Sequence, residues 1–259
     1  MEMTTLGRFV DAVRDIVDRW TLPDADWYPA PWFRGHGDAN WRLEPGWYRL
    51  PPPGQGVEAD WYNERNLLLE FKFRAPRYLQ TLPSNDWEWL FLMQHYGLPT
   101  RLLDWTESAL IGLYFALRDN RGAGDAAVWM LNPWWLNKQS LGTYEIPHAG
   151  ESHIADWAPL GDEKVLQARL PVAIKPIQAS PRISALKGFF TIHGAERGAL
   201  EKLSHSNADK GPGLRKLTIP RARVVEMKRD LAVAGITETT VFQDIDGLCR
   251  EIKFGFFGS

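Results

Sequence analysis

The chain has 259 residues, of which 44% are hydrophobic and 24% charged, and its formal net charge is −2 at pH 7. This near balance argues against a broad nucleic-acid-binding surface, although it leaves room for a local basic cleft. One cysteine gives neither a disulfide framework nor a thiolate metal site, and no apolar run approaches the roughly 20 residues of a transmembrane helix. Without a signal-peptide pattern, we expect a cytoplasmic protein that needs no membrane.

The first predicted element is an amphipathic helix over residues 1–17, because six apolar residues, from Leu6 to Val17, fall on one face. A proline-interrupted linker and a short strand should follow it. A Pro-Pro-Pro-Gly-Gln-Gly run without periodicity predicts a loop, and the helix after that loop should end at a proline. These elements are expected at residues 21–31 (linker), 32–34 (strand), 45–58 (loop) and 61–75 (helix, closed by Pro76).

Two apolar helices are predicted in the middle of the chain, at residues 86–96 and at about 106–119. Asp86 is placed to cap the first helix, and Gly97 supplies a stop signal after it. Thr106 is placed to cap the second, which is apolar almost all round. We therefore expect the second helix to be buried.

The connection between these two helices is polar. A polar connection between buried helices must satisfy its polar groups inside the protein, so its side chains should converge in a confined space. Such convergence suits a binding or catalytic site, and it equally suits a rigid structural network. The residues concerned are Gln94, His95, Thr100, Arg101, Asp104 and Thr106.

The second half of the chain mixes strands with irregular segments and one more helix. Helical segments come first and mixed segments later, which favours the α+β class with a small, mainly antiparallel sheet. We expect one domain over residues 1–259, with an N-terminal helix and linker at 1–30 and a core at 31–254. The later elements are expected at 125–131, 172–177, 188–192 and 214–219 (strands), 133–168 (irregular, with His148 and His153), 204–213 (loop) and 222–234 (helix, stopped by Gly235).

Three motifs carry a family resemblance. The first is Trp32-Phe33-Arg34-Gly35-His36, followed by Trp41 and Arg42; the second is the run Gln94–Thr106 with Leu113-Tyr114-Phe115-Ala116; the third is Asp244-Ile245-Asp246-Gly247-Leu248. In this order they resemble the FRG domain family, which is named after Phe-Arg-Gly. The resemblance extends over roughly residues 30 to 250. It implies a bacterial or viral source and no particular reaction.

A second similarity concerns ADP-ribosyltransferases of the Arg-Ser-Glu type. Phe33-Arg34-Gly35 and the Thr106–Ala116 segment are similar to the layout of that family, in which an Arg-Gly strand is later followed by a helix with an Ala-x-x-Phe-Ala-like pattern. The similarity implies that an arginine holds the phosphates of NAD, aromatic rings hold nicotinamide, and an acid stabilises the developing ribosyl cation. Glu226 and Glu251 are candidates for the late glutamate of that family.

Individual residues allow both functional and structural interpretations. The planar fork of Arg34 suits a phosphate, whereas a buried ion pair with Asp104 would be structural. His95 at a helix end could cap that helix, and the acidic pair Asp244 and Asp246 could cap the next one. The predicted catalytic residues are Arg34, Gln94, His95 and Asp104, and the predicted cofactor-binding residues are Gly35, His36, Trp41, Arg101, Trp105 and Thr106.

These features lead to one first hypothesis and two alternatives. The first is an ADP-ribosyltransferase-like or NAD-cleaving enzyme, such as a toxin or phage-defence effector. It would use NAD as a substrate, no metal, and a protein or nucleic-acid acceptor. The second is a non-catalytic ligand- or protein-binding module, and the third a nuclease or nucleotide-processing hydrolase. The sequence has no His-Glu-x-x-His, Walker or Gly-x-Ser-x-Gly motif.

Overall fold

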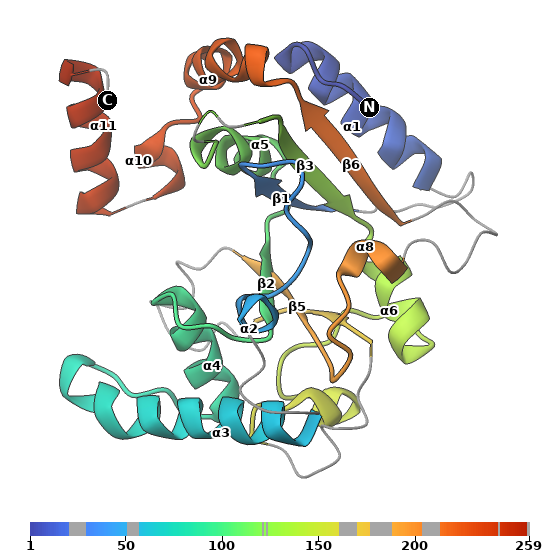
Figure 1. Ribbon diagram of the computed structural model, residues 1–259, viewed down its shortest axis with the longest axis vertical. Helices are drawn as coiled ribbons and strands as arrows, with labels where there is room; N and C mark the ends of the chain where they lie inside the picture. The colour runs from blue at the N-terminus through green and yellow to red at the C-terminus, as the bar shows by residue number, and fades with distance from the viewer. Residues whose placement is uncertain are drawn as a thin grey trace. The chain divides into compact units, whose positions relative to one another are not determined.

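The computed structural model describes residues 1–20, 30–50, 57–120, 122, 124–160, 170–176, 188–203, 213–242 and 244–257. Over this part of the chain, helices alternate with strands, and the strands form two antiparallel three-stranded sheets (Figure 1). This arrangement confirms the α+β class. The predicted linker and the predicted loop at 204–213 lie almost entirely outside the described residues. The chain groups into two compact units, each built from separate segments: Met1–Trp41, Thr106–Asn132 and Leu214–Ser259 form unit 1, and Arg42–Trp105 and Pro133–Gly213 form unit 2. The single-domain assignment stays a prediction.

Unit 1 is built on the sheet β1-β3-β6, in which β3 is the central strand. All three strands were expected from their apolar or alternating patterns. Residues 1–3 were expected to be helical, but Glu2 bridges Thr218 and adds a short edge to the sheet. The helix α1 therefore begins only at Leu6. The strands are β1 (Trp32–His36), β3 (Ala126–Leu131) and β6 (Leu214–Ile219).

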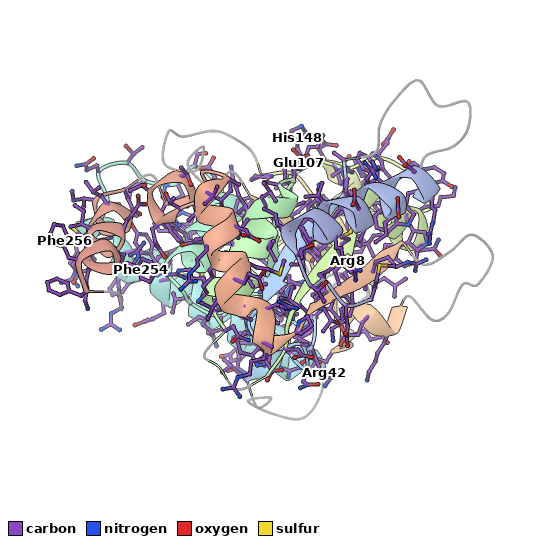
Figure 2. The ribbon with its side chains drawn as sticks, turned by 90° about the horizontal axis from the view of Figure 1, so that it is seen from above. Arg8, Arg42, Glu107, His148, Phe254 and Phe256 are labelled. Carbon is purple, nitrogen blue, oxygen red and sulfur yellow. The ribbon has the colours of Figure 1, made fainter. Side chains whose placement is uncertain are left out.

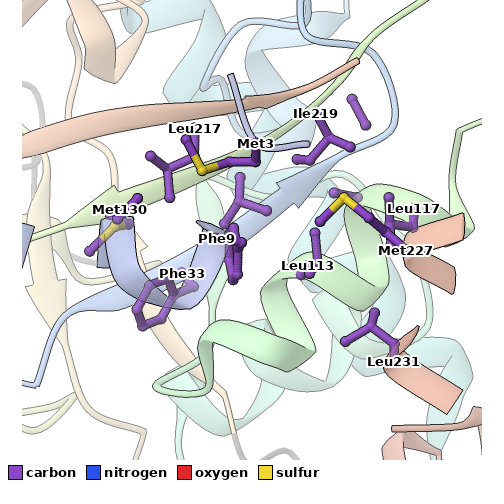
Figure 3. Close-up of a cluster of buried hydrophobic side chains, with 14 of the residues drawn as sticks. Met3, Phe9, Phe33, Leu113, Leu117, Met130, Leu217, Ile219, Met227 and Leu231 are labelled. Atoms are coloured by element: carbon purple, nitrogen blue, oxygen red, sulfur yellow. The ribbon is translucent and has the colours of Figure 1, made fainter. Parts of the chain in front are cut away.

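One face of this sheet carries the core of unit 1. Successive side chains of a strand point to opposite faces, so Phe33, Met130 and Leu217 share the core face (Figure 3). Three helices cover that face with apolar residues that include Phe9 and Leu113. These helices are α1 (Leu6–Trp20), α5 (Ala109–Arg118) and α9 (Val224–Val233, preceded by a 3₁₀ turn at Arg221–Arg223).

Helix α5 crosses β1 at very short range. A Cβ added to Gly35 would lie 2.3 Å from the backbone nitrogen of Ala116 and 2.3 Å from the carbonyl oxygen of Gly112. A Cβ on Gly112 would in turn lie 2.8 Å from that of Phe33. The two glycines face each other across the interface between helix and strand, and side chains on either would push the two elements apart.

Unit 2 is built on the sheet β2-β5-β4. Its strands were expected at 172–177 and 188–192 but not at 102–105, where the sequence suggested a polar connection. The segment pairs instead with β5, because Leu102, Leu103 and Trp105 are apolar and become buried. Only Asp104 of this strand is exposed. The strands are β2 (Leu102–Trp105), β4 (Val172–Ile174) and β5 (Phe189–Ile192).

Helix α4 lies beside this sheet and contributes Trp87, Leu90 and Phe91 to its core, as predicted. Asn85 caps the helix in place of the expected Asp86: its side chain accepts a hydrogen bond from the backbone of Glu88. Gly97, at φ +79°, ends it as predicted. The helices and 3₁₀ turns of unit 2 are α2 (Gly46–Arg49), α3 (Val57–Arg74), η1 (Ala75–Tyr78), α4 (Asp86–His95), α6 (Pro133–Leu141), η2 (Ser152–Trp157) and α8 (Leu200–Leu203).

Two helices of unit 2 occupy segments that were expected to be irregular. Helix α2 lies within the predicted loop at 45–58, and α6 begins the predicted irregular segment at 133–168. Asn137 explains the position of α6: its side chain exchanges hydrogen bonds of 2.7 and 2.9 Å with the backbone of Ala173 in β4. Helix α6 was not predicted from the sequence because its apolar residues lack a clear helical period.

The last elements of unit 1 are two helices, α10 (Glu238–Val241) and α11 (Ile245–Phe257). Glu238 ties them to α5, because its carboxylate accepts hydrogen bonds from Arg118 at 3.1 Å and from Arg250 at 2.9 Å. Both guanidinium groups lie 4.9 Å from the ring centre of Phe242. Over the residues that the structure describes, no helix is long and apolar enough to cross a membrane.

Candidate functional site

A polar row crosses the second face of the unit 1 sheet, opposite the core. Arg34 of β1 pairs with Trp129 of β3, and Trp129 pairs with Lys216 of β6, so the three side chains lie abreast. The Lys216 ammonium lies 5.2 Å from the indole centre of Trp129, and its Nζ also donates to the carbonyl of Ala39. Two cations therefore flank a nearly buried indole.

His36 extends this row along β1. The Nε of Arg34 donates a hydrogen bond of 3.3 Å to Nε2 of His36, which is only 4% exposed. In this bond the Nε2 atom of His36 is the acceptor, which is the role of a ring nitrogen that carries no proton. The ring of Trp41 meets that of His36 edge-on at 6.0 Å and is 49% exposed. The motif thus ends in an accessible aromatic surface beside a buried imidazole.

Thr106 lies on the strand edge next to this row. It forms an antiparallel bridge with Phe33, with backbone hydrogen bonds of 2.7 and 2.9 Å. Thr106 was expected to cap α5, but Ser108 does so, accepting a hydrogen bond from the backbone of Ile111. The Thr106 hydroxyl accepts from the backbone of Ser108 and shapes the turn that enters the helix. Helix α5 therefore begins three residues beyond the bridge to β1.

In unit 2, three of the six predicted polar side chains come together. The amide nitrogen of Gln94 donates to the Asp104 carboxylate at 2.7 Å, and the Thr100 hydroxyl donates to the Gln94 oxygen at 2.6 Å. The same hydroxyl accepts from the backbone of Leu102 at 3.1 Å. Gln94 thus links the end of α4 to Asp104 within β2 and to Thr100 just before the strand, and it orients a carboxylate that is exposed.

Arg101 points away from this chain of hydrogen bonds into the interior of unit 2. Its Nε donates to Glu64 at 2.6 Å, and its Nη atoms donate to the carbonyls of His193 at 2.6 Å and Trp157 at 3.3 Å. Arg101 and Glu64 are both almost fully buried. The guanidinium joins three segments of unit 2, which is the geometry of a structural clamp.

The other two predicted residues of unit 2 have separate surroundings. Trp105 is buried, and its Nε1 donates to the Thr191 hydroxyl at 3.1 Å; that hydroxyl lies 3.2 Å from the His193 ring nitrogen. His95 is exposed at the end of α4, with its ring edge-on to that of Tyr96 at 5.1 Å. Neither residue joins the hydrogen-bonded chain formed by Gln94.

The late acidic residues have local partners. Glu226 pairs with Arg223 at 2.8 Å on α9, a helix of the core face, and Asp244 caps α11 through the backbone of Gly247 at 2.6 Å. Glu251 accepts from the backbone and hydroxyl of Thr239 at 2.7 and 2.5 Å, and these hydrogen bonds hold the pKa of its carboxyl below the ordinary value. Asp246 lies exposed in the first turn of α11. Glu226, Asp244 and Glu251 therefore have local structural roles.

An open pocket of about 650 Å³ lies elsewhere in unit 2. Trp87, Asp86, His148 and Glu151 line it, and none of them belongs to the predicted site. The Glu151 carboxylate accepts a hydrogen bond from the backbone of His148 at 2.9 Å and so fixes the loop at its rim. Among the described residues, no group of three or more His, Cys, Asp or Glu side chains could hold a metal ion.

The structure thus sorts the predicted residues into separate groups. Arg34, His36, Trp41 and Thr106 belong to unit 1, with Gly35 packed against α5; Gln94 and Asp104 share one hydrogen-bonded chain in unit 2. Because Arg34 and Asp104 belong to different units, their predicted ion pair and shared cleft stay predictions. Sequence reasoning missed Trp129 and Lys216. Lys216 lies between Arg215 and Leu217 in β6, and the alternation of the strand places it on the face opposite Leu217, which was the available signal.

The fold and this polar row define an α+β protein whose Phe-Arg-Gly strand presents a cationic and aromatic face opposite its core. Residues 30–124 match the family model of the FRG domain, so the family expected from the motifs is confirmed over that stretch. The match contains the first two motifs and ends before Asp244–Leu248. No curated protein and no solved structure matches the chain.

Proposed function

We propose that unit 1 binds a phosphate-bearing nucleotide on the polar face of its sheet, with NAD as the first candidate. The observation that supports this is the row Arg34, Trp129 and Lys216. Arginine offers a planar fork for phosphate oxygens, and lysine adds a second point charge. The exposed ring of Trp41 provides a surface on which a planar base or nicotinamide can stack. NAD carries a pyrophosphate between its adenine and nicotinamide rings, so its charged and aromatic groups match this set of side chains.

The reaction that we propose on this ligand is cleavage of the nicotinamide–ribose bond. The bond between C1′ and the ring nitrogen breaks, and nicotinamide leaves with the electron pair, which neutralises its positive ring. Water then adds to C1′ and releases a proton, giving ADP-ribose; in the transferase version, an acceptor nucleophile takes the place of water. Arg34 would hold the phosphates throughout. From the sequence we expect Asp104 to orient groups, and the acid that stabilises the ribosyl cation stays unassigned; loss of nicotinamide release in Asp104→Asn would support the orienting role.

Titration calorimetry with NAD and an assay for released nicotinamide test this proposal. Arg34→Ala should weaken NAD binding by about 10- to 100-fold, since a hydrogen bond to a charged group contributes about 1.5–3 kcal/mol. Arg34→Lys should also fail to restore turnover, because a point charge cannot replace a bidentate fork. Arg8→Ala is the matched control: it removes the same charge from the exposed surface of α1, where Figure 2 labels it. A wild-type protein that neither binds millimolar NAD nor releases nicotinamide would refute the proposal.

The alternative is a binding module without catalysis. The observation that favours it is the Asp104–Gln94–Thr100 chain, which ends on the backbone of β2 and so has the form of a structural brace. In the related prediction of a structural Arg34–Asp104 pair, the exposure of Asp104 limits the cost of either single substitution to about 0–1 kcal/mol. The double change Arg34→Met with Asp104→Leu would then melt close to either single variant. Folded but inactive single variants would instead favour the enzyme.

A further inference from the structure

Helix α11 carries an apolar stripe that the described residues of unit 1 leave exposed. Ile245, Leu248, Ile252 and Phe256 recur at spacings of three and four residues, which places them on one side of the helix. They are 69%, 42%, 50% and 81% exposed, and Figure 2 shows Phe256 projecting outward at the end of the helix. Cys249 is exposed within the same stripe.

The opposite side of α11 holds the helix in place. Gly247 is its buried residue, and a Cβ there would meet the carbonyl oxygen of Phe242 at 2.5 Å. Glu251, one turn further, accepts the hydrogen bonds from Thr239 that tie α11 to α10. These contacts hold one side of α11 against α10 and leave the apolar stripe exposed on the other side. The stripe is therefore part of the surface of a packed helix.

We propose that this stripe pairs with the same stripe of a second copy, with the two α11 helices antiparallel. A twofold axis near residue 250 sets Leu248 of one copy against Ile252 of the other, and Ile245 against the end that carries Phe256. Apolar residues then meet apolar residues along the whole helix. An isologous contact of this kind closes after two copies, so it gives a dimer and no filament.

The charges on one flank of the stripe select this arrangement over others. Asp246 stands in the first turn and Lys253 seven residues later, on the same flank. In the antiparallel pair, Asp246 of each copy lies level with Lys253 of the second copy, and the two helix dipoles oppose. A parallel pair would instead place these charges on opposite flanks of the two copies, where they cannot pair, and would set like dipole ends together. The charges of two α11 helices are thus complementary when the helices are antiparallel.

The exposed area of the stripe indicates the affinity that we expect for the dimer. Its exposed apolar residues amount to roughly 500 Å² per copy, taking about 200 Å² for a fully exposed large side chain. A standard stable interface buries about 800 Å² per partner, so a contact of this area should give a weak dimer that forms in the micromolar range. This inference is independent of the proposed nucleotide site.

Sedimentation equilibrium of the full chain between about 1 and 200 μM tests the dimer. We expect a shift from monomer to dimer, and Ile252→Glu should weaken association by at least tenfold. Val233→Glu is the matched control: it adds the same charge to a 91% exposed apolar residue at the end of α9 and should leave the dimer intact. A wild-type chain that stays monomeric at 200 μM, or an Ile252→Glu variant that still dimerises fully, overturns the proposal.

A charge exchange tests the direction of the pair. Asp246→Lys and Lys253→Asp should each weaken the dimer, and the double variant should recover at least half of the lost association energy, because both cross-pairs are restored with reversed signs. Cys249 lies close to the twofold axis, so mild oxidation should link two copies through a disulfide, and Cys249→Ser should abolish that link. A double variant no stronger than the singles overturns the antiparallel register. A monomer that binds vesicles of neutral lipid through Phe256 overturns self-pairing in favour of a membrane surface.

Discussion

Gly35→Ala tests the closest contact in unit 1. In the wild type, the position of its missing Cβ lies 2.3 Å from the Ala116 nitrogen, 2.3 Å from the Gly112 oxygen and 2.9 Å from the Phe115 carbonyl carbon. All three atoms belong to the backbone of α5, so no side chain can rotate away to make room. The helix must move by about 1 Å from β1, and Leu113 moves with it.

The cost of that movement can be worked from the packing. Inserting a methyl group into a well-packed interior typically costs 1–3 kcal/mol, and the rigid helix backbone places Gly35→Ala at the upper end, about 3 kcal/mol. For a chain of this length, about 3 kcal/mol lowers the melting temperature by roughly 6–12 °C. Thermal unfolding followed by circular dichroism, together with urea denaturation, measures both quantities.

Gly7→Ala is the control for this prediction. Gly7 lies exposed in α1 with nothing within 4 Å of an added Cβ, so the same chemical change should be neutral or should stabilise by up to about 1 kcal/mol. If Gly35→Ala melts within 1 °C of the wild type, α5 does not press on β1 as described. In that case the glycine of the Phe-Arg-Gly motif serves some purpose other than packing.

Three further predictions concern stability. Leu113→Ala should cost about 2–5 kcal/mol in urea denaturation, because the side chain is fully buried; an unchanged midpoint would contradict its place in the core. Arg101→Met should cost about 3–5 kcal/mol by leaving Glu64 buried without compensation, and adding Glu64→Leu should recover most of the loss; failure to recover would show that the pair is not coupled. Burial raises the pKa of Glu238, but contacts with the Tyr114 hydroxyl and two arginines outweigh burial and hold it below 4.5. The stability that these contacts confer is therefore full above pH 4.5 and is lost as the pH falls through the lowered pKa, so Glu238→Gln should flatten the decline in melting temperature on acidification.

Much of the fold could be predicted because its signals are local. The strand at residues 126–131 is an apolar run between turn residues, and α1 shows a helical period, so each could be located without its partners. The strand β2 could not be located in this way, because Asp104 and the polar residues before it made the segment look like a polar connection. Its identity depends on β5, which follows more than 80 residues later. Helix α6 was hidden for a similar reason, since the hydrogen bonds of Asn137 that position it reach to β4.

The candidate site shows the same division. Arg34, His36 and Trp41 are close in sequence, and the motif was sufficient to predict them. Lys216 comes beside Arg34 only through the register of two strand pairs, with Trp129 between them. A sequence fixes such a register through the sum of many apolar contacts, and no short motif reveals it.

The three residues of the Phe-Arg-Gly motif act together through the alternation of β1. Phe33 and Gly35 face the core, one filling it and the other leaving space for α5, so the residue between them must face the opposite side. That residue is Arg34. A slip of one residue in the pairing of β1 with β3 would bury the guanidinium among Leu113 and Met130, at a cost that far exceeds any single apolar contact. The packing of α5 against Gly35 thus fixes the register that presents Arg34 beside Trp129, so the stability of unit 1 and the geometry of its polar face depend on the same contact.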